Sequence, residues 1–179
     1  MSCASDAPYT PSNQSEQLEY SRDLLNAYPA DVRTNLESYT NVGVAWAGII
    51  RDTTIDDSAN GVISATTSFD HHYFDWQQDW TTHGQLLNVS PRGEGVFVTH
   101  WKMRKDEFDA TTEDAENFAA PGKLAIVYGV PQALQDGTIV LRYRYLRVVD
   151  PTHFNTNVYD YGRFDEPVRY LYTPAVKPQ

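Results

Sequence analysis

The sequence predicts a mainly β fold in a single domain, and three observations support this prediction. Aromatic residues make up 13% of the 179 residues, a composition enriched in strands. Five segments carry runs of apolar and β-branched residues, separated by turn signals such as DDSANG and Asp136-Gly137. Because 41% of the residues are hydrophobic, the chain can bury a core, which argues against global disorder.

The order of these segments predicts a particular barrel. The predicted strands span residues 41–55, 62–76, 95–103, 123–132 and 138–150. Residues 77–92 are expected to form a loop, and the acidic segment 106–122 a short helix or a structured loop. Three strands, a helix or loop, and two strands is the order of a five-stranded OB-like Greek-key barrel.

The first strand has an unusual pattern. Val44 and Trp46 alternate with Ala45 and Ala47, so both faces of the strand are apolar and both are expected to be covered. Small residues here, including Gly48, indicate a close approach of another backbone or a bend.

Segments on either side of the barrel are predicted to be appendages. Residues 1–15 are small and polar and predict a flexible tether, and residues 16–40 predict a helical appendage. Its first helix has Ser15 as a plausible cap, and its second begins near Pro29 with Asp31 in the first turn. The β domain occupies residues 41–179, with a Tyr-rich extension from about residue 151 that we expect to fold back over the barrel.

Charge and cysteine content limit the possible functions. The formal net charge is −10, and because affinity for nucleic acid comes largely from Lys and Arg, no nucleic-acid partner is expected. The single cysteine, Cys3, excludes an intramolecular disulfide. A lone Cys followed by a tether is typical of a mature bacterial lipoprotein, and the alternative is an incidental cysteine near a cytosolic N-terminus.

Three segments resemble a known family. NVGVAWAGII, the stretch from GEGVFVTHW to KLAIVYGVPQ, and GTIVLRYRYLRVVD resemble blocks of the Slp family of outer-membrane lipoproteins. The resemblance implies an OB-like barrel on the periplasmic face of the outer membrane of a Gram-negative bacterium, anchored by a lipid on Cys3. It also implies no enzymatic activity, no cofactor, and an envelope role through a protein, glycan or lipid partner.

The segment SPRGEG, residues 90–95, is expected to be structural. It matches neither a phosphate-binding loop nor a nucleophile elbow, because its glycines open a strand and Ser90 lies between Val89 and Pro91. Gly93 and Gly95 are instead expected to supply unusual φ values at a bend or bulge.

The segment DHHYFDWQQDWTTH, residues 70–83, supplies the candidate metal ligands. Asp70 and His72 share one face of the predicted strand, and His83 or His100 is placed to join them. No zinc motif is present, so we predict no metal and favour hydrogen-bonding surface roles. A metal or small-ligand module remains the alternative function, followed by a His/Asp hydrolase, for which no nucleophile is evident.

Aromatic and basic residues supply the remaining candidates. The possible ligand-binding residues are Tyr73, Trp76, Trp80 and Trp101. Aromatic side chains on an OB-like barrel stack on sugars or bases, but we favour a role in the core and in a hydrophobic loop cover. In RYRYLR, Arg142 and Arg144 are expected to share one face opposite Tyr143 and Tyr145. The arginines are expected to pair with carboxylates of residues 106–116.

Overall fold

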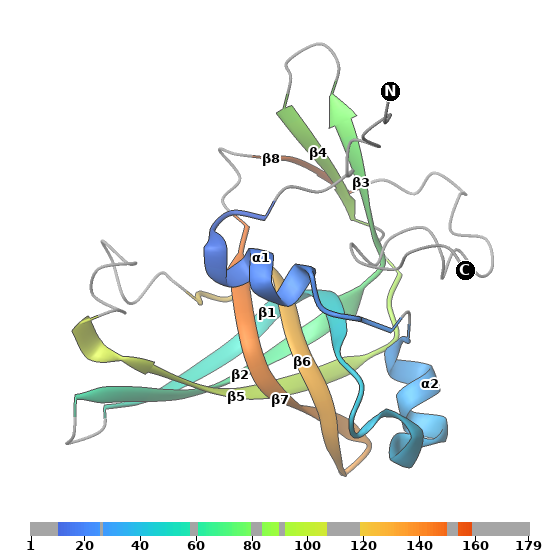
Figure 1. Ribbon diagram of the computed structural model, residues 1–179, viewed down its shortest axis with the longest axis vertical. Coiled ribbons are helices and arrows are strands. Elements are labelled where there is room, and N and C mark those ends of the chain that lie inside the picture. Colours follow the sequence, from blue (N-terminus) through green and yellow to red (C-terminus); the bar gives the residue numbers. More distant parts are fainter. Residues whose placement is uncertain are drawn as a thin grey trace.

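The computed structural model describes residues 11–25, 27–57, 61–79, 84–89, 92–106, 119–149 and 154–158 (Figure 1). The helices are α1 (Gln14–Tyr20), α2 (Pro29–Thr34) and the 3-10 helix η1 (Leu36–Tyr39). The strands are β1 (Val44–Asp57), β2 (Val62–His72), β3 (Phe74–Asp79), β4 (Gly84–Val89), β5 (Val96–Arg104), β6 (Leu124–Gln135), β7 (Thr138–Val148) and β8 (Phe154–Val158).

Five strands close into a barrel in the order β1-β2-β5-β7-β6, with β6 pairing back to β1. All neighbours are antiparallel except β5 and β7, which are parallel. This is the strand order of an OB barrel, so the predicted fold class is confirmed.

The barrel interior follows from alternation along the strands. Every second residue of β2 is buried, which turns Thr67 and Phe69 inward and leaves the residues between them partly exposed. The largest fully buried side chains are Trp46, Trp101, Tyr128, Phe69, Phe97, Ile50, Ile126, Ile139 and Leu141. Most of them fill one cluster inside the barrel, which is the main core.

Both faces of β1 are covered, as the sequence predicts. Val44 and Trp46 belong to the interior cluster, whereas Ala45 and Ala47 belong to a second cluster on the outside. At Gly48 an added Cβ would lie 2.8 Å from the Cβ of Phe69, so the close approach expected in this strand occurs there.

The N-terminal appendage covers the outside of β1, β6 and β7. Helix α1 begins at Gln14 and is capped by the side chain of Asn13, not by Ser15. Leu24 belongs to the outer cluster with Ala45 and Ala47. Helix α2 begins at Pro29, as expected from the sequence.

A second sheet is formed by β3 and β4, which lie between barrel strands β2 and β5 in the sequence, and by β8, which follows β7. It has the order β3-β4-β8 and stands apart from the barrel in Figure 1. The prediction of a loop over 77–92 is therefore wrong for β4 and for the end of β3. The C-terminal extension pairs with β4 through β8, and residues 159–179 lie outside the described residues. The local sequence did not indicate β4, because one of its two neighbours in the sheet is β8, about seventy residues later in the chain.

Candidate functional site

The outer face of β2, β5 and β7 carries polar and basic residues beside Val98 and Asp70. It is defined here by six residues, and we call it the β2–β5–β7 face. Its residues are Ser64, Thr66, Ser68, His100, Lys102 and Arg142. These side chains point outward because successive side chains of a strand alternate between its two faces. Their neighbours in the chain, including Thr67, Trp101 and Leu141, are buried inside the barrel.

The pairing register places these residues side by side. Thr66 is opposite His100, which is opposite Arg142, so one row crosses three strands. Ser64 is opposite Lys102 in the next row. Adjacent strands are about 5 Å apart, and alternate residues on one strand about 7 Å apart. A ligand that runs across the strands can therefore contact both basic side chains.

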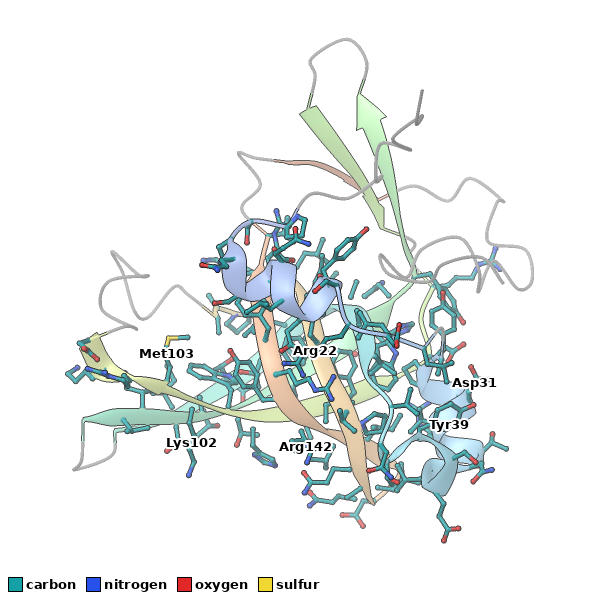
Figure 2. All side chains as sticks on the ribbon, in the orientation of Figure 1. Arg22, Asp31, Tyr39, Lys102, Met103 and Arg142 are labelled. Atoms are coloured by element: carbon teal, nitrogen blue, oxygen red, sulfur yellow. The ribbon has the colours of Figure 1, made fainter. Side chains whose placement is uncertain are left out.

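Some side chains on or beside this face already form hydrogen bonds or ion pairs. Thr66 Oγ1 and His100 Nδ1 are 2.8 Å apart. Arg104, beyond the face on β5, donates to the Asp106 carboxylate at 3.0 and 2.5 Å. Within the described part of the chain no ion pair involves Lys102 or Arg142. Both project along the lower side of the barrel in Figure 2.

The arginines of RYRYLR do not form one stripe. The register shifts between Tyr128 and Gly129 of β6, which leaves Arg144 as the extra residue of a β-bulge. Tyr143 consequently packs with the interior clusters and Tyr145 with the outer one. The predicted common face of the two tyrosines is therefore wrong, because the bulge inverts the alternation.

The partners of these arginines also differ from the prediction. Arg147 pairs with Glu16 of α1 at 3.2 Å, and Arg144 lies 3.9 Å from Glu19. Helix α1 occupies this part of the barrel surface, so these carboxylates take the place expected for those of residues 106–116. Arg142 lies before the bulge and stays exposed.

The described residues around Glu94 make structural contacts. Gly95 has a φ of +83°, as expected, but Gly93 has no positive φ, so the unusual φ expected there is wrong. Gly93 is instead a point of close approach, because an added Cβ would lie 1.5 Å from the carbonyl oxygen of His71. The Glu94 carboxylate accepts hydrogen bonds from the Ala30 N–H at 2.6 Å and from the Tyr73 hydroxyl. Glu94 thereby ties the start of α2 to the barrel.

His71 is a buried histidine in an aromatic cluster. Its ring packs edge-on against Tyr28, Trp46 and Tyr73. Nδ1 accepts a hydrogen bond from the Glu94 N–H at 3.1 Å. Burial lowers the pKa of His71 from 6.5 to about 3, and the charges of His72 and Arg33 act in the same direction.

This histidine predicts a loss of stability in mild acid. The unfolded chain binds a proton at His71 near pH 6.5, whereas the folded protein does not until about pH 3. Neutral His71 therefore makes its full contribution to the free energy of unfolding above pH 6.5. This contribution is lost as the pH falls, and the loss is about 2 kcal/mol at pH 5. Urea unfolding at both pH values should show this loss, and His71→Gln, which keeps an acceptor but does not titrate, should reduce it. An equal loss in the variant would contradict this assignment.

The candidate metal ligands are not brought together among the described residues. Asp70 pairs with Arg51 at 3.5 Å, and His72 lies opposite Ala47 of β1. His100 lies four register positions from Asp70, about 13 Å along the strands. No group of three potential ligands occurs in the described part of the chain, and His83 lies outside it.

The aromatic candidates have different locations. Trp101 is 1% exposed and donates from Nε1 to Thr67 Oγ1 at 3.0 Å, so it belongs to the core and does not face a ligand. Tyr73 packs on Tyr28 and His71 within the structural cluster around Glu94. The side chain of Trp76 and the whole of Trp80 lie outside the described residues.

Sequence reasoning missed Lys102 and the three hydroxyl residues of the β2–β5–β7 face, and it gave His100 and Arg142 other roles. The signal was present in HWKMR, where His100, Lys102 and Arg104 alternate with Trp101 and Met103. Whole-chain charge obscured it. Cys3, the predicted lipid anchor, lies outside the described residues, so the structure does not test its lipidation. None of the described helices has the length and apolar character needed to cross a membrane.

Comparisons with known proteins return only structural similarities. No family model matches the chain, and neither does any curated protein. The structure of the PriB protein from Ralstonia solanacearum is similar at 12% identity, covering 60% of this chain and 97% of PriB, with a TM-score of 0.33. A small single-stranded DNA-binding protein from Streptomyces coelicolor is similar at 13% identity, covering 60% of this chain and 92% of that protein, with a TM-score of 0.38.

Two predictions are corrected by these findings. The interpretation as an outer-membrane lipoprotein of the envelope is wrong, since the similar structures are PriB and a single-stranded DNA-binding protein. The described parts of the Slp-like segments lie largely in strands β1, β5, β6 and β7, and the family resemblance itself stays a prediction. The exclusion of a nucleic-acid partner is also corrected, since one of these structures is named a single-stranded DNA-binding protein. The exclusion rested on the net charge of −10, which does not describe any one surface.

Proposed function

We propose that this chain is a non-enzymatic binding protein for single-stranded nucleic acid, and that the strand lies across the β2–β5–β7 face. One observation carries the proposal. The two strands that most often bind ligands in OB barrels are here β2, which presents three hydroxyl groups, and β5, which presents Lys102 beside them. Arg142 lies next to β5 on β7.

Binding of a strand depends on the charges close to it more than on the net charge of the chain. Charges further apart than about 8 Å are largely screened at physiological ionic strength. Lys102 and Arg142 lie on the face itself and attract a bound phosphate directly. The nearest described carboxylates are at its edge: Asp52 lies opposite Ser68, and Asp70 pairs with Arg51. An anionic strand is favoured over a neutral glycan, because cations give a neutral sugar little affinity.

The side chains of the face favour contacts with the sugar-phosphate backbone. Serine and threonine hydroxyls and basic side chains contact phosphates, and such contacts carry no sequence information directly. The six residues of the face include no Phe, Tyr or Trp, so His100 is their one ring available for stacking. We therefore expect weak sequence preference and strong salt dependence.

Lys102→Gln and Arg142→Gln test the proposal. Binding of a labelled oligothymidylate of about 16 nucleotides is measured by fluorescence anisotropy between about 50 and 200 mM salt. Each substitution is expected to weaken binding and to reduce the slope of log K against log salt by about 0.7, the value for one phosphate contact on a single strand.

Arg92→Gln is the matched control. Arg92 is an exposed cation before β5, ten residues from Lys102 along the chain. The control removes the same charge from the chain and should leave the slope unchanged. Equal effects of all three substitutions would mean that only net charge matters, and no binding at low salt would reject the proposed function.

A further inference from the structure

Helix α1 covers a second surface of the barrel, next to the β2–β5–β7 face. Figure 1 shows α1 crossing β6 and β7. We call the surface beneath it the covered patch and define it by four residues of these strands. They are Tyr128, Arg144, Tyr145 and Arg147.

Acidic and polar residues of the helix contact every member of the covered patch. The Glu16 carboxylate is buried and accepts hydrogen bonds from Arg147 at 3.2 and 3.4 Å and from the Tyr128 hydroxyl at 3.2 Å. Asn13 Nδ2 donates to the Tyr145 hydroxyl at 2.6 Å. Glu19 lies 3.9 Å from Arg144.

The covered patch has the chemistry of a site for a polyanionic strand. Arginines neutralise phosphates, and tyrosine rings stack on bases, which the β2–β5–β7 face lacks. The two are continuous, because Arg142 precedes Arg144 by two residues on β7. Glu16 and Glu19, three residues apart on one helical face, occupy the positions that two anionic groups of a ligand would take.

The contacts that hold α1 on the barrel are weak enough for the helix to be released. A helix of seven residues has little stability of its own and depends on what it packs against. Glu19 Oε2 is buried and lies 3.2 Å from Arg22 Nε, yet it forms no hydrogen bond among the described residues. An incompletely satisfied carboxylate weakens the docked state. Leu24, packed with Ala45 and Ala47, supplies the apolar part of the attachment.

We propose that α1 is a displaceable acidic strap that occupies a second binding surface for the same single-stranded polyanion. Release of the strap would extend the binding path along β7 from Arg142 to Arg147, over about 17 Å. The proposal rests on the proposed function for the class of ligand. The contacts of α1 themselves do not depend on it.

The test is the full-length double variant Glu16→Gln/Glu19→Gln. Because a helix of seven residues depends on what it packs against, loss of the two carboxylate charges that face Arg147 and Arg144 is expected to release it. Trypsin should cleave after Arg22 faster than in the wild type. The salt slope for oligothymidylate should steepen by about 1.4, from two added phosphate contacts. Glu37→Gln/Asp136→Asn makes the same change in charge at exposed positions away from the cleavage site and should change neither.

The outcomes separate this proposal from the previous one. Faster cleavage with the slope of the control overturns the second surface, and unchanged cleavage overturns the strap. Binding by the variant but not by the wild type supports the strap and rejects the β2–β5–β7 face as sufficient. No binding by either protein rejects both proposals.

A second variant covers the case in which the double variant does not fold. Leu24→Ala weakens the attachment without leaving a buried charge unpaired. It should also speed tryptic cleavage after Arg22 and strengthen oligothymidylate binding. Faster cleavage without stronger binding would again overturn the second surface.

Discussion

Trp46→Ala is expected to lower the free energy of unfolding by about 3 to 5 kcal/mol. Trp46 is fully buried, packs edge-on against Phe97 and His71, and donates from Nε1 to the carbonyl oxygen of Ala27 at 2.7 Å. The substitution removes a large apolar volume from inside the barrel and leaves that carbonyl without its partner. Urea unfolding at neutral pH measures the loss.

Two companion variants divide this effect into its parts. Trp46→Phe keeps most of the apolar volume but loses the hydrogen bond to Ala27, so about 1 to 3 kcal/mol should be lost. Leu134→Ala changes a partly exposed residue and should cost about 0.5 kcal/mol or less. A loss at Trp46→Ala as small as that at Leu134 would contradict the packed interior.

Gly93→Ala is expected to cost about 3 kcal/mol or more, although Gly93 is exposed. The added Cβ would lie 1.5 Å from the carbonyl oxygen of His71 and 2.5 Å from its carbonyl carbon. The obstacle is the backbone of a barrel strand, which cannot rotate away as a side chain does. Thermal and urea unfolding measure the cost.

Gly61→Ala provides the comparison for Gly93. Gly61 has a φ of +69° with nothing within 4 Å of an added Cβ, so its substitution carries only the cost of left-handed backbone, about 1 to 2 kcal/mol. Gly93 has no positive φ, so its cost comes from the close approach alone. Equal costs at the two glycines would contradict that close approach.

Local patterns predicted much of the barrel because its strands are long and alternate regularly. The apolar residues on both faces of β1 and the alternation in β2 are visible in the sequence, and they correspond to the buried residues of the two clusters. The same alternation in HWKMR marks Lys102 as an outward cation when charge is considered strand by strand. The net charge of the whole chain therefore hides a local cation that the alternation along β5 reveals.

Other features depend on contacts that no local pattern contains. Glu16 and Arg147 are 131 positions apart in the chain, and only the fold brings them together. The bulge at Arg144 inverts the alternation of RYRYLR, and its sequence carries no mark of the extra residue. Strand β4 pairs on one side with β8, so the strand could not be predicted from its own short sequence.

The way the chain leaves and re-enters the barrel has a consequence for modularity. The Tyr73 N–H donates to the Arg92 carbonyl oxygen at 3.1 Å, and the His71 N–H to that of Gly95 at 2.9 Å. The two ends of the intervening segment are thus held together by the barrel itself. Closing a loop between such fixed ends costs entropy that rises only slowly with length. The barrel can therefore accept segments of very different size at this junction, where new binding elements can be added at little cost in stability.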